Sequence, residues 1–145
     1  MKTKLKNLKG FTIIEVLIVL AIAGLIMVII FIAVPALQRS QRNETRNNDA
    51  RLILNSINEC LSNRNGVSTS CDAIGGSEVI LPTNLKTVTT ATYGAGTGSI
   101  TAATWVFSAA CAADGNSTVG ATGREFAVRY QVETTGAAQN RCISG

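Results

Sequence analysis

One carboxylate, Glu15, lies at the start of the longest apolar run in the chain, within the stretch KGFTIIEVLIVL at residues 9–20. The 22 residues that follow it, 16–37, carry no charge. As a helix they extend roughly 33 Å at about 1.5 Å per residue, enough to cross a bilayer core of about 30 Å. An ionised carboxylate at bilayer depth costs about 2.5–3.5 kcal/mol or more. Glu15 therefore needs either a cationic partner or a place at the membrane interface.

Four cysteines lie beyond the apolar run: Cys60, Cys71, Cys111 and Cys142. An even number outside a membrane segment is typical of two disulfides formed in an oxidising compartment. Of the three possible pairings we favour Cys60–Cys71 with Cys111–Cys142, because these join the helix end to the next loop and hold the C-terminal segment. Reduced, buried thiols are the alternative. The lack of any C-x₂₋₄-C pair argues against a zinc or other metal site.

The sequence contains no recognisable catalytic motif. The sequence has no histidine, no G-x-S-x-G motif, no phosphate-binding loop and no cysteine with an evident base partner. We expect no enzyme activity, no catalytic residues and no cofactor.

The positive charge is concentrated ahead of the apolar run, in the lysines Lys2, Lys4, Lys6 and Lys9. The rest of the chain holds nine basic and nine acidic residues. A basic flank keeps the N-terminus in the cytoplasm and directs the following chain across the membrane. The run is too long for a secretory signal and no A-x-A site follows it, so we expect a retained single-pass anchor.

Three arginines follow the apolar run, Arg39, Arg42 and Arg46. We interpret them as a solvated face or a contact with lipid headgroups. DNA binding by the single chain is not expected, because the chain beyond residue 10 is neutral and DNA-binding proteins usually carry a dominant basic patch.

A long helix is predicted from residue 11 onward, with Gly24 and Pro35 as its weak points. Residues 38–49 are polar all round, which favours either a solvated or an interrupted helix. An amphipathic stripe then begins, formed by Ala50, Ile53, Leu54, Ile57 and Leu61. Gly66, after Asn65, is the expected C-terminal cap.

The clearest predicted strand is 125–133, with 78–81, 86–92 and 104–108 as weaker candidates. A short antiparallel sheet packed on the amphipathic half of the helix is the simplest arrangement, so the predicted fold class is α+β. Two short segments, Asn43-Glu44-Thr45 and Asn116-Ser117-Thr118, match the N-glycosylation pattern, which is weak evidence by itself.

The segment Gly10-Phe11-Thr12-x-x-Glu15, after a lysine-rich leader and before the apolar span, resembles the N-terminus of a type IV pilin precursor. The close resemblance covers roughly residues 6–38. It implies a cleaved leader at 1–10, a transmembrane and filament-core helix at 11–37, a polar then amphipathic continuation at 38–66, and a disulfide-stapled β-sheet head at 67–145.

The resemblance also implies roles for individual residues. Gly10 is the last leader residue before the prepilin peptidase cut, and Phe11 is the new, N-methylated terminus. Cleavage creates a cationic α-amino group four residues ahead of Glu15, which pairs with it within or between subunits and so governs assembly. Gly24 and Pro35 lie in the region that loses helicity on assembly, although Pro35 is three residues later than the proline expected in well-known relatives.

The functional expectation is a structural subunit of a type IV pilus, polymerised into an extracellular filament that serves adhesion, twitching motility or DNA uptake. In many pilins a pair like Cys111 and Cys142 closes the C-terminal loop. The implied partners are other pilin subunits in a helical homopolymer, the prepilin peptidase, the assembly ATPase with its inner-membrane platform, and membrane lipid before assembly. The alternatives are a type II secretion pseudopilin and a membrane-anchored binding protein that does not polymerise.

Overall fold

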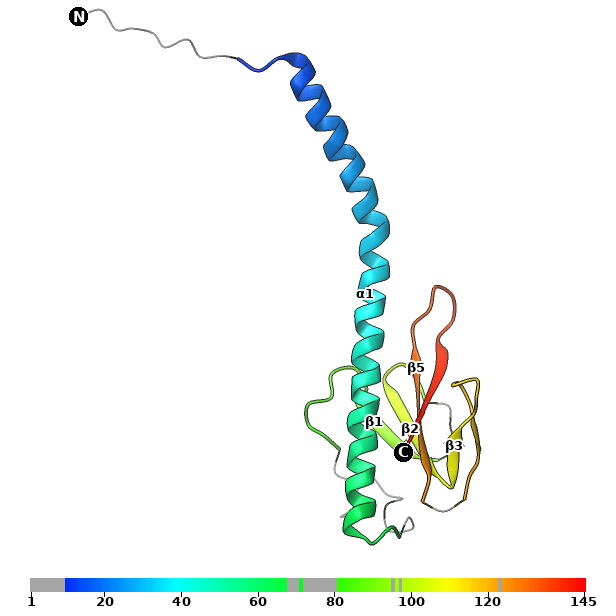
Figure 1. Cartoon of the computed structure of the whole chain (residues 1–145). Helices are drawn as coiled ribbons and strands as arrows, with labels where there is room; N and C mark the ends of the chain where they lie inside the picture. The colour runs from blue at the N-terminus through cyan, green and yellow to red at the C-terminus, as the bar shows by residue number, and fades with distance from the viewer. Residues whose placement is uncertain (1–9, 68–70, 72–80, 95, 97, 123) are drawn as a thin grey trace, which may run out of the picture. The chain divides into compact units, whose positions relative to one another are not determined.

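The computed structural model describes residues 10–67, 71, 81–94, 96, 98–122 and 124–145. The chain divides into two units, Met1–Gln38 and Arg39–Gly145. One helix, α1 (Ile13–Asn63), contributes its first half to the first unit and its second half to the second (Figure 1). The described strands all belong to the second unit: β1 (Thr90–Tyr93), β2 (Ala102–Phe107), β3 (Ala109–Cys111), β4 (Thr118–Gly120), β5 (Phe126–Val132) and β6 (Gln139–Ser144).

In the first unit α1 is apolar around its circumference, and every large apolar side chain from Phe11 to Leu37 is at least 40% exposed. Among the described residues, α1 is the one helix long and apolar enough to cross a membrane. Pro35 lies inside the helix without ending it. A proline there costs about 3 kcal/mol in water, and neighbouring groups in a membrane can satisfy the freed backbone carbonyl. Of the two predicted possibilities, the structure shows the uninterrupted helix.

The end of α1 is capped where predicted, with Asn65 at the capping position and the predicted residue Gly66 directly after it. Asn65 takes the left-handed conformation with φ 52°, and the Gly66 N–H donates to the Leu61 carbonyl at 2.7 Å. A second bond runs from the Asn65 N–H to the Ser62 carbonyl at 3.4 Å. This pair of bonds is a Schellman motif with asparagine at the left-handed position. The Arg124 guanidinium adds a bond to the Asn65 carbonyl at 3.2 Å, placing a cation at the negative end of the helix.

The main sheet has the strand order β1-β2-β5-β6. The β2–β5 and β5–β6 pairs are antiparallel and the β1–β2 pair is parallel, so the predicted small antiparallel sheet is confirmed as a mostly antiparallel one. The parallel pairing places the start of β2 beside the start of β1, and the backbone ahead of β2 takes the left-handed conformation at Gly98, whose φ is 71°. A β-carbon there would lie 2.9 Å from the Ala102 carbonyl oxygen and 3.0 Å from that of Arg129.

A second, two-stranded sheet is formed by β3 and β4, with Cys111 opposite Thr118. Strand β3 contacts both β5 and β6. This contact helps to explain why β5 is buried at five successive residues, Phe126–Tyr130, instead of alternating.

The core of the second unit lies between α1 and the main sheet. Ala50, Ile53, Ile57 and Leu61 are buried, and Leu54 is half-buried and packed against them, so the predicted stripe is confirmed. Their partners from the sheet are led by Trp105, Phe126, Val128 and Tyr130. Each fully buried side chain of this size contributes roughly 1.5–3 kcal/mol by leaving water.

The strand predictions were right in part. β5 falls within the predicted 125–133, and β2 begins two residues ahead of the predicted 104–108. β1 begins only at Thr90, because the backbone of residues 86–88 binds a helix carboxylate instead of a strand. Of the candidate at 78–81, residues 78–80 lie outside the described residues and Leu81 is not in a strand. Strands β3, β4 and β6 were not predicted.

Candidate processing and assembly site

Helix α1 starts at a capping residue, Thr12, that was not predicted as one from the sequence. Thr12 precedes the helix, and its Oγ1 accepts a bond from the Glu15 N–H at 3.4 Å. Threonine followed three residues later by glutamate is a capping box, of which the structure shows the Thr12 half. Glu15 also lies in the first turn, where the helix dipole favours a negative charge. Thr12 therefore caps the start of the helix, and Glu15 places a negative charge in its first turn.

The residues around the expected cleavage point are open to solvent. Phe11 is 85% exposed, and a β-carbon built on Gly10 would meet nothing within 4 Å. A groove of about 330 Å³ runs beside them, lined by Phe11, Glu15, Val16, Val19 and Leu20. The chain at the Gly10–Phe11 bond is thus accessible, and Glu15 supplies a carboxylate to an otherwise apolar groove.

Residues 5–31 match the protein family described as the prokaryotic N-terminal methylation motif. A search of curated proteins and a search of solved structures found no match. The matched segment opens a long apolar helix whose second half packs on a small β-sheet. The chain is a type IV pilin-like protein.

The motif of this pilin-like protein implies processing by a prepilin peptidase and contact with an assembly machinery. Pilin-like proteins are generally non-enzymatic structural proteins. The apolar helix with its motif indicates a membrane or extracellular, pilus-type location. In the first unit, Gly24 and Pro35 both lie within continuous helix.

In the second unit of the pilin-like protein, a polar clamp joins α1 to the end of β5. Glu133 receives bonds from Arg42 Nη2 at 2.7 Å and from Arg46 Nη2 at 2.5 Å. The Asn43 amide donates to the Glu133 carbonyl at 2.7 Å and accepts from its N–H at 2.8 Å. The hydrogen bonds from Arg42 and then Arg46 lower the pKa of Glu133 to about 2. We call Arg42, Asn43, Arg46 and Glu133 the clamp.

The clamp corrects our interpretation of the arginines. Arg46 is only 4% exposed, and it also donates to the Ile100 carbonyl at 3.3 Å and to the Asn43 amide oxygen at 3.0 Å. Arg42 is exposed but is engaged by both oxygens of Glu133. Two of the three arginines therefore serve the packing of the head, and neither is a purely solvated or lipid-facing residue.

A second polar contact of α1 is the buried carboxylate of Asp49, 2% exposed. Its Oδ2 accepts from the Thr87 N–H and hydroxyl, both at 2.7 Å, and from the Val88 N–H at 2.9 Å. It also accepts from the Lys86 N–H at 3.2 Å. Burial raises the pKa of Asp49, but these bonds, led by the one from Val88, outweigh it and the pKa is lowered. The carboxylate takes the place of a neighbouring strand for residues 86–88.

Both disulfides are present, in the pairing that we favoured. Cys60 at the end of α1 is joined to Cys71, and Cys111 of β3 is joined to Cys142 of β6. The second bond ties the small sheet to the edge strand of the main sheet.

The interior positions of Arg46 and Asp49 were not predicted, because residues 38–49 are polar all round. The signal was their spacing. Positions 46, 50, 53 and 57 follow at intervals of three or four residues, and position 49 lies beside 50 and three residues after 46, so the two charged residues lie on the face that packs against the sheet.

Proposed function

We propose that the chain is a structural subunit of a type IV pilus. In this proposal a prepilin peptidase cuts after Gly10, the new terminus at Phe11 is methylated, and the subunits polymerise through α1. The observation that carries the proposal is the Gly10-Phe11-Thr12-x-x-Glu15 motif ahead of an apolar helix surface that nothing covers within the described residues. Contiguous apolar surface of this extent is otherwise found at membrane or protein interfaces.

The proposed role of Glu15 in assembly follows from the cut. Cleavage before Phe11 places a cationic α-amino group within reach of the first turn of α1, where it pairs with Glu15 of the same or a neighbouring subunit. In a water-poor filament core this attraction is stronger than in water. Before assembly, the membrane lipid surrounds the span, with the N-terminus cytoplasmic and the head outside.

Two disulfides fit export to an oxidising compartment, and the one that closes the C-terminal part of the head, as in many pilins, favours an extracellular pilus over the short periplasmic filament of type II secretion. Adhesion, twitching motility and DNA uptake are the roles that a pilus would serve.

The test is mass spectrometry of filaments sheared from the cell surface. We expect a chain that begins at methylated Phe11 as a component of these filaments. Cleaved protein confined to the cell envelope would favour the secretion pseudopilin, and only uncleaved protein in the membrane would refute both.

Glu15→Ala separates processing from assembly. Cleavage should persist in this variant, because Gly10 and Phe11 are unchanged, while surface filaments should fall to a small fraction of the wild-type amount. Glu15→Gln is the matched variant that keeps the capping position but removes the charge, and it should behave like Glu15→Ala. Normal filaments in the glutamine variant would refute the ion-pair mechanism.

A further inference from the structure

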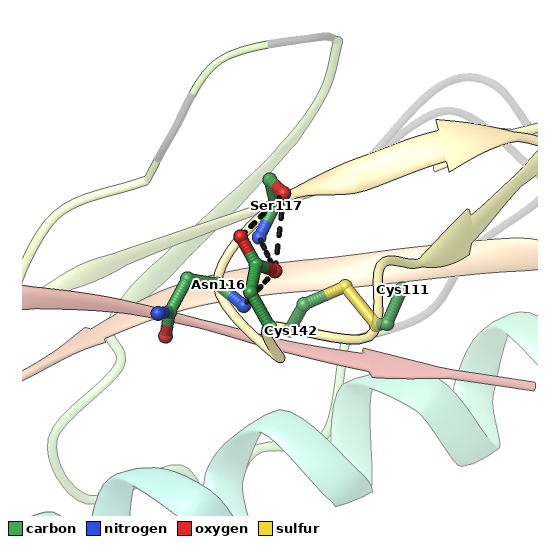
Figure 2. The surroundings of a disulfide bond; sticks show 5 residues. Cys111, Asn116, Ser117 and Cys142 are labelled. Atoms are coloured by element: carbon green, nitrogen blue, oxygen red, sulfur yellow. Dashed lines mark hydrogen bonds between the residues drawn. A yellow bond between two sulfur atoms is a disulfide. The ribbon is translucent and has the colours of Figure 1, made fainter.

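The two N-glycosylation patterns in the chain occupy different structural settings. Asn43 lies in the clamp, where its amide nitrogen and oxygen are both bonded to the backbone of Glu133. Asn116 lies in the turn between β3 and β4, close to the Cys111–Cys142 disulfide (Figure 2). Only the second asparagine has an amide nitrogen with no bond among the described residues.

The turn that carries Asn116 is held from within. The Asp114 carboxylate accepts bonds from the Asn116 N–H at 2.9 Å and from the Ser117 N–H at 3.1 Å. The Cys142 N–H donates to the Gly115 carbonyl at 2.9 Å, which fixes the turn on β6. These hydrogen bonds hold the backbone of the turn, and the Asn116 side chain makes none of them.

The orientation of the Asn116 amide suits attachment of a glycan. Its Oδ1 is buried without a partner among the described residues, whereas its Nδ2 is not among the buried, unsatisfied atoms. Figure 2 shows the side chain extending away from Ser117 and from the disulfide. The surroundings are open, since Ser117 is exposed and a β-carbon on Gly115 would meet nothing within 4 Å.

We infer that Asn116 is an N-glycosylation site, and that Asn43 is not modified in the folded head. The donor is an oligosaccharide linked to a polyprenyl pyrophosphate, and the enzyme is a membrane oligosaccharyltransferase. The Asn116 Nδ2 attacks the anomeric carbon, a C–N bond forms and the carbon–oxygen bond to pyrophosphate breaks. The polyprenyl pyrophosphate leaves with the bonding electrons, and the Nδ2 proton passes to a base of the transferase.

Thr118 supplies the hydroxyl that the pattern requires two residues after the asparagine. It is the first residue of β4, so the acceptor segment runs from the turn into the strand. The inference rests on the proposed function in one respect, namely that the head is exported to the side of the membrane where glycans are transferred.

The test is peptide mapping by mass spectrometry of the full-length protein from the cells that produce it. We expect a glycan on the peptide with Asn116 and none on that with Asn43. Thr118→Val, which keeps the β-branched shape but lacks the hydroxyl, should lose the glycan, and so should Asn116→Gln. Thr118→Ser, which keeps the hydroxyl, should retain it.

The same map contains the N-terminal peptide, which distinguishes the two proposals. Methylated Phe11 together with unmodified Asn116 would overturn the glycosylation inference alone. An uncleaved leader with unmodified Asn116 would overturn the proposed function as well. A glycan that persists in Thr118→Val would show that the attachment point is elsewhere, and mapping of the Cys111–Cys142 disulfide would confirm that each variant has folded.

Discussion

Replacing Asp49 by alanine tests whether the buried carboxylate organises residues 86–88. The substitution leaves four donors of that segment without an acceptor: the N–H of Val88, which is buried, the N–H and hydroxyl of Thr87, which is half-buried, and the N–H of Lys86, which is exposed and can turn to water. A buried donor left unsatisfied costs about 1–3 kcal/mol. Counting Val88 in full and Thr87 in part, we expect Asp49→Ala to lower the free energy of unfolding by about 3–4 kcal/mol.

The assay is urea unfolding of the full-length protein in a mild detergent, followed by the fluorescence of Trp105. This residue is the single tryptophan of the chain and is fully buried in the head, so its emission reports on the second unit. With a urea dependence of about 1.5 kcal/mol per molar, the unfolding midpoint should fall by about 2 M. Asn48→Ala is the matched control, because Asn48 is the exposed neighbour on the same helix and should change stability by less than about 0.5 kcal/mol.

The pH dependence provides a second readout for Asp49. Because folding lowers its pKa, the carboxylate stabilises the head above its ordinary pKa of about 4, and this stabilisation is lost as the pH falls further. The gap between wild type and Asp49→Ala should therefore narrow in acid. A shift in Asp49→Ala no larger than that of Asn48→Ala would refute the reasoning, since it would mean that water replaces the carboxylate at no cost.

Two further predictions concern the clamp and the disulfides. Glu133→Gln should lower the thermal unfolding midpoint at pH 7. Because the pKa of Glu133 falls from 4.5 to about 2 on folding, the difference in midpoint from wild type should shrink below pH 4.5 and be largely gone near pH 2. Circular dichroism over that pH range would measure the midpoints, and a difference that does not change with pH would contradict the ion pairing. Replacing both Cys111 and Cys142 by serine should lower the free energy of unfolding by about 4 kcal/mol, because this disulfide closes a loop of 31 residues. The same change at Cys60 and Cys71 should cost about 3 kcal/mol, because that loop has 11 residues. Urea unfolding would rank the two variants, and the reverse order would refute the argument from loop entropy.

The sequence predicted the parts of the fold that depend on local periodicity. The stripe at Ile53 and Ile57 and the strand at 126–132 follow from apolar spacing, and the end of the helix near Gly66 follows from the conformational freedom of glycine. Local periodicity does not show whether neighbouring strands run parallel or antiparallel. Nothing in residues 90–93 shows that β1 runs parallel to β2, because the direction depends on how the chain returns to the sheet, which includes the close approach of Gly98 to the backbone of Ala102 and Arg129.

The polar contacts of the head were harder to predict for a different reason. The partners of Arg42 and Asp49 lie 91 and 37–39 residues away in the chain, so no local pattern pairs them. Strands as short as β3 and β4 likewise depend on tertiary contacts, here the disulfide and the turn at Asp114, because three residues are too few to show an alternating pattern. By contrast, the Gly10-to-Glu15 motif was readable at once because its residues are contiguous.

The fully apolar circumference of α1 in the first unit has a consequence for the energetics of the proposed filament. Lipid tails are as apolar as leucine, so a helix that leaves a bilayer for a bundle of similar helices gains almost nothing from the hydrophobic effect. The choice of neighbour and of axial register must then come from shape and from charge. Between residues 13 and 38 the only charged side chain is that of Glu15. In the proposed filament, the carboxylate of Glu15 would therefore supply the electrostatic interaction that orders subunits, which diffuse freely in the membrane, into a polymer with a defined register.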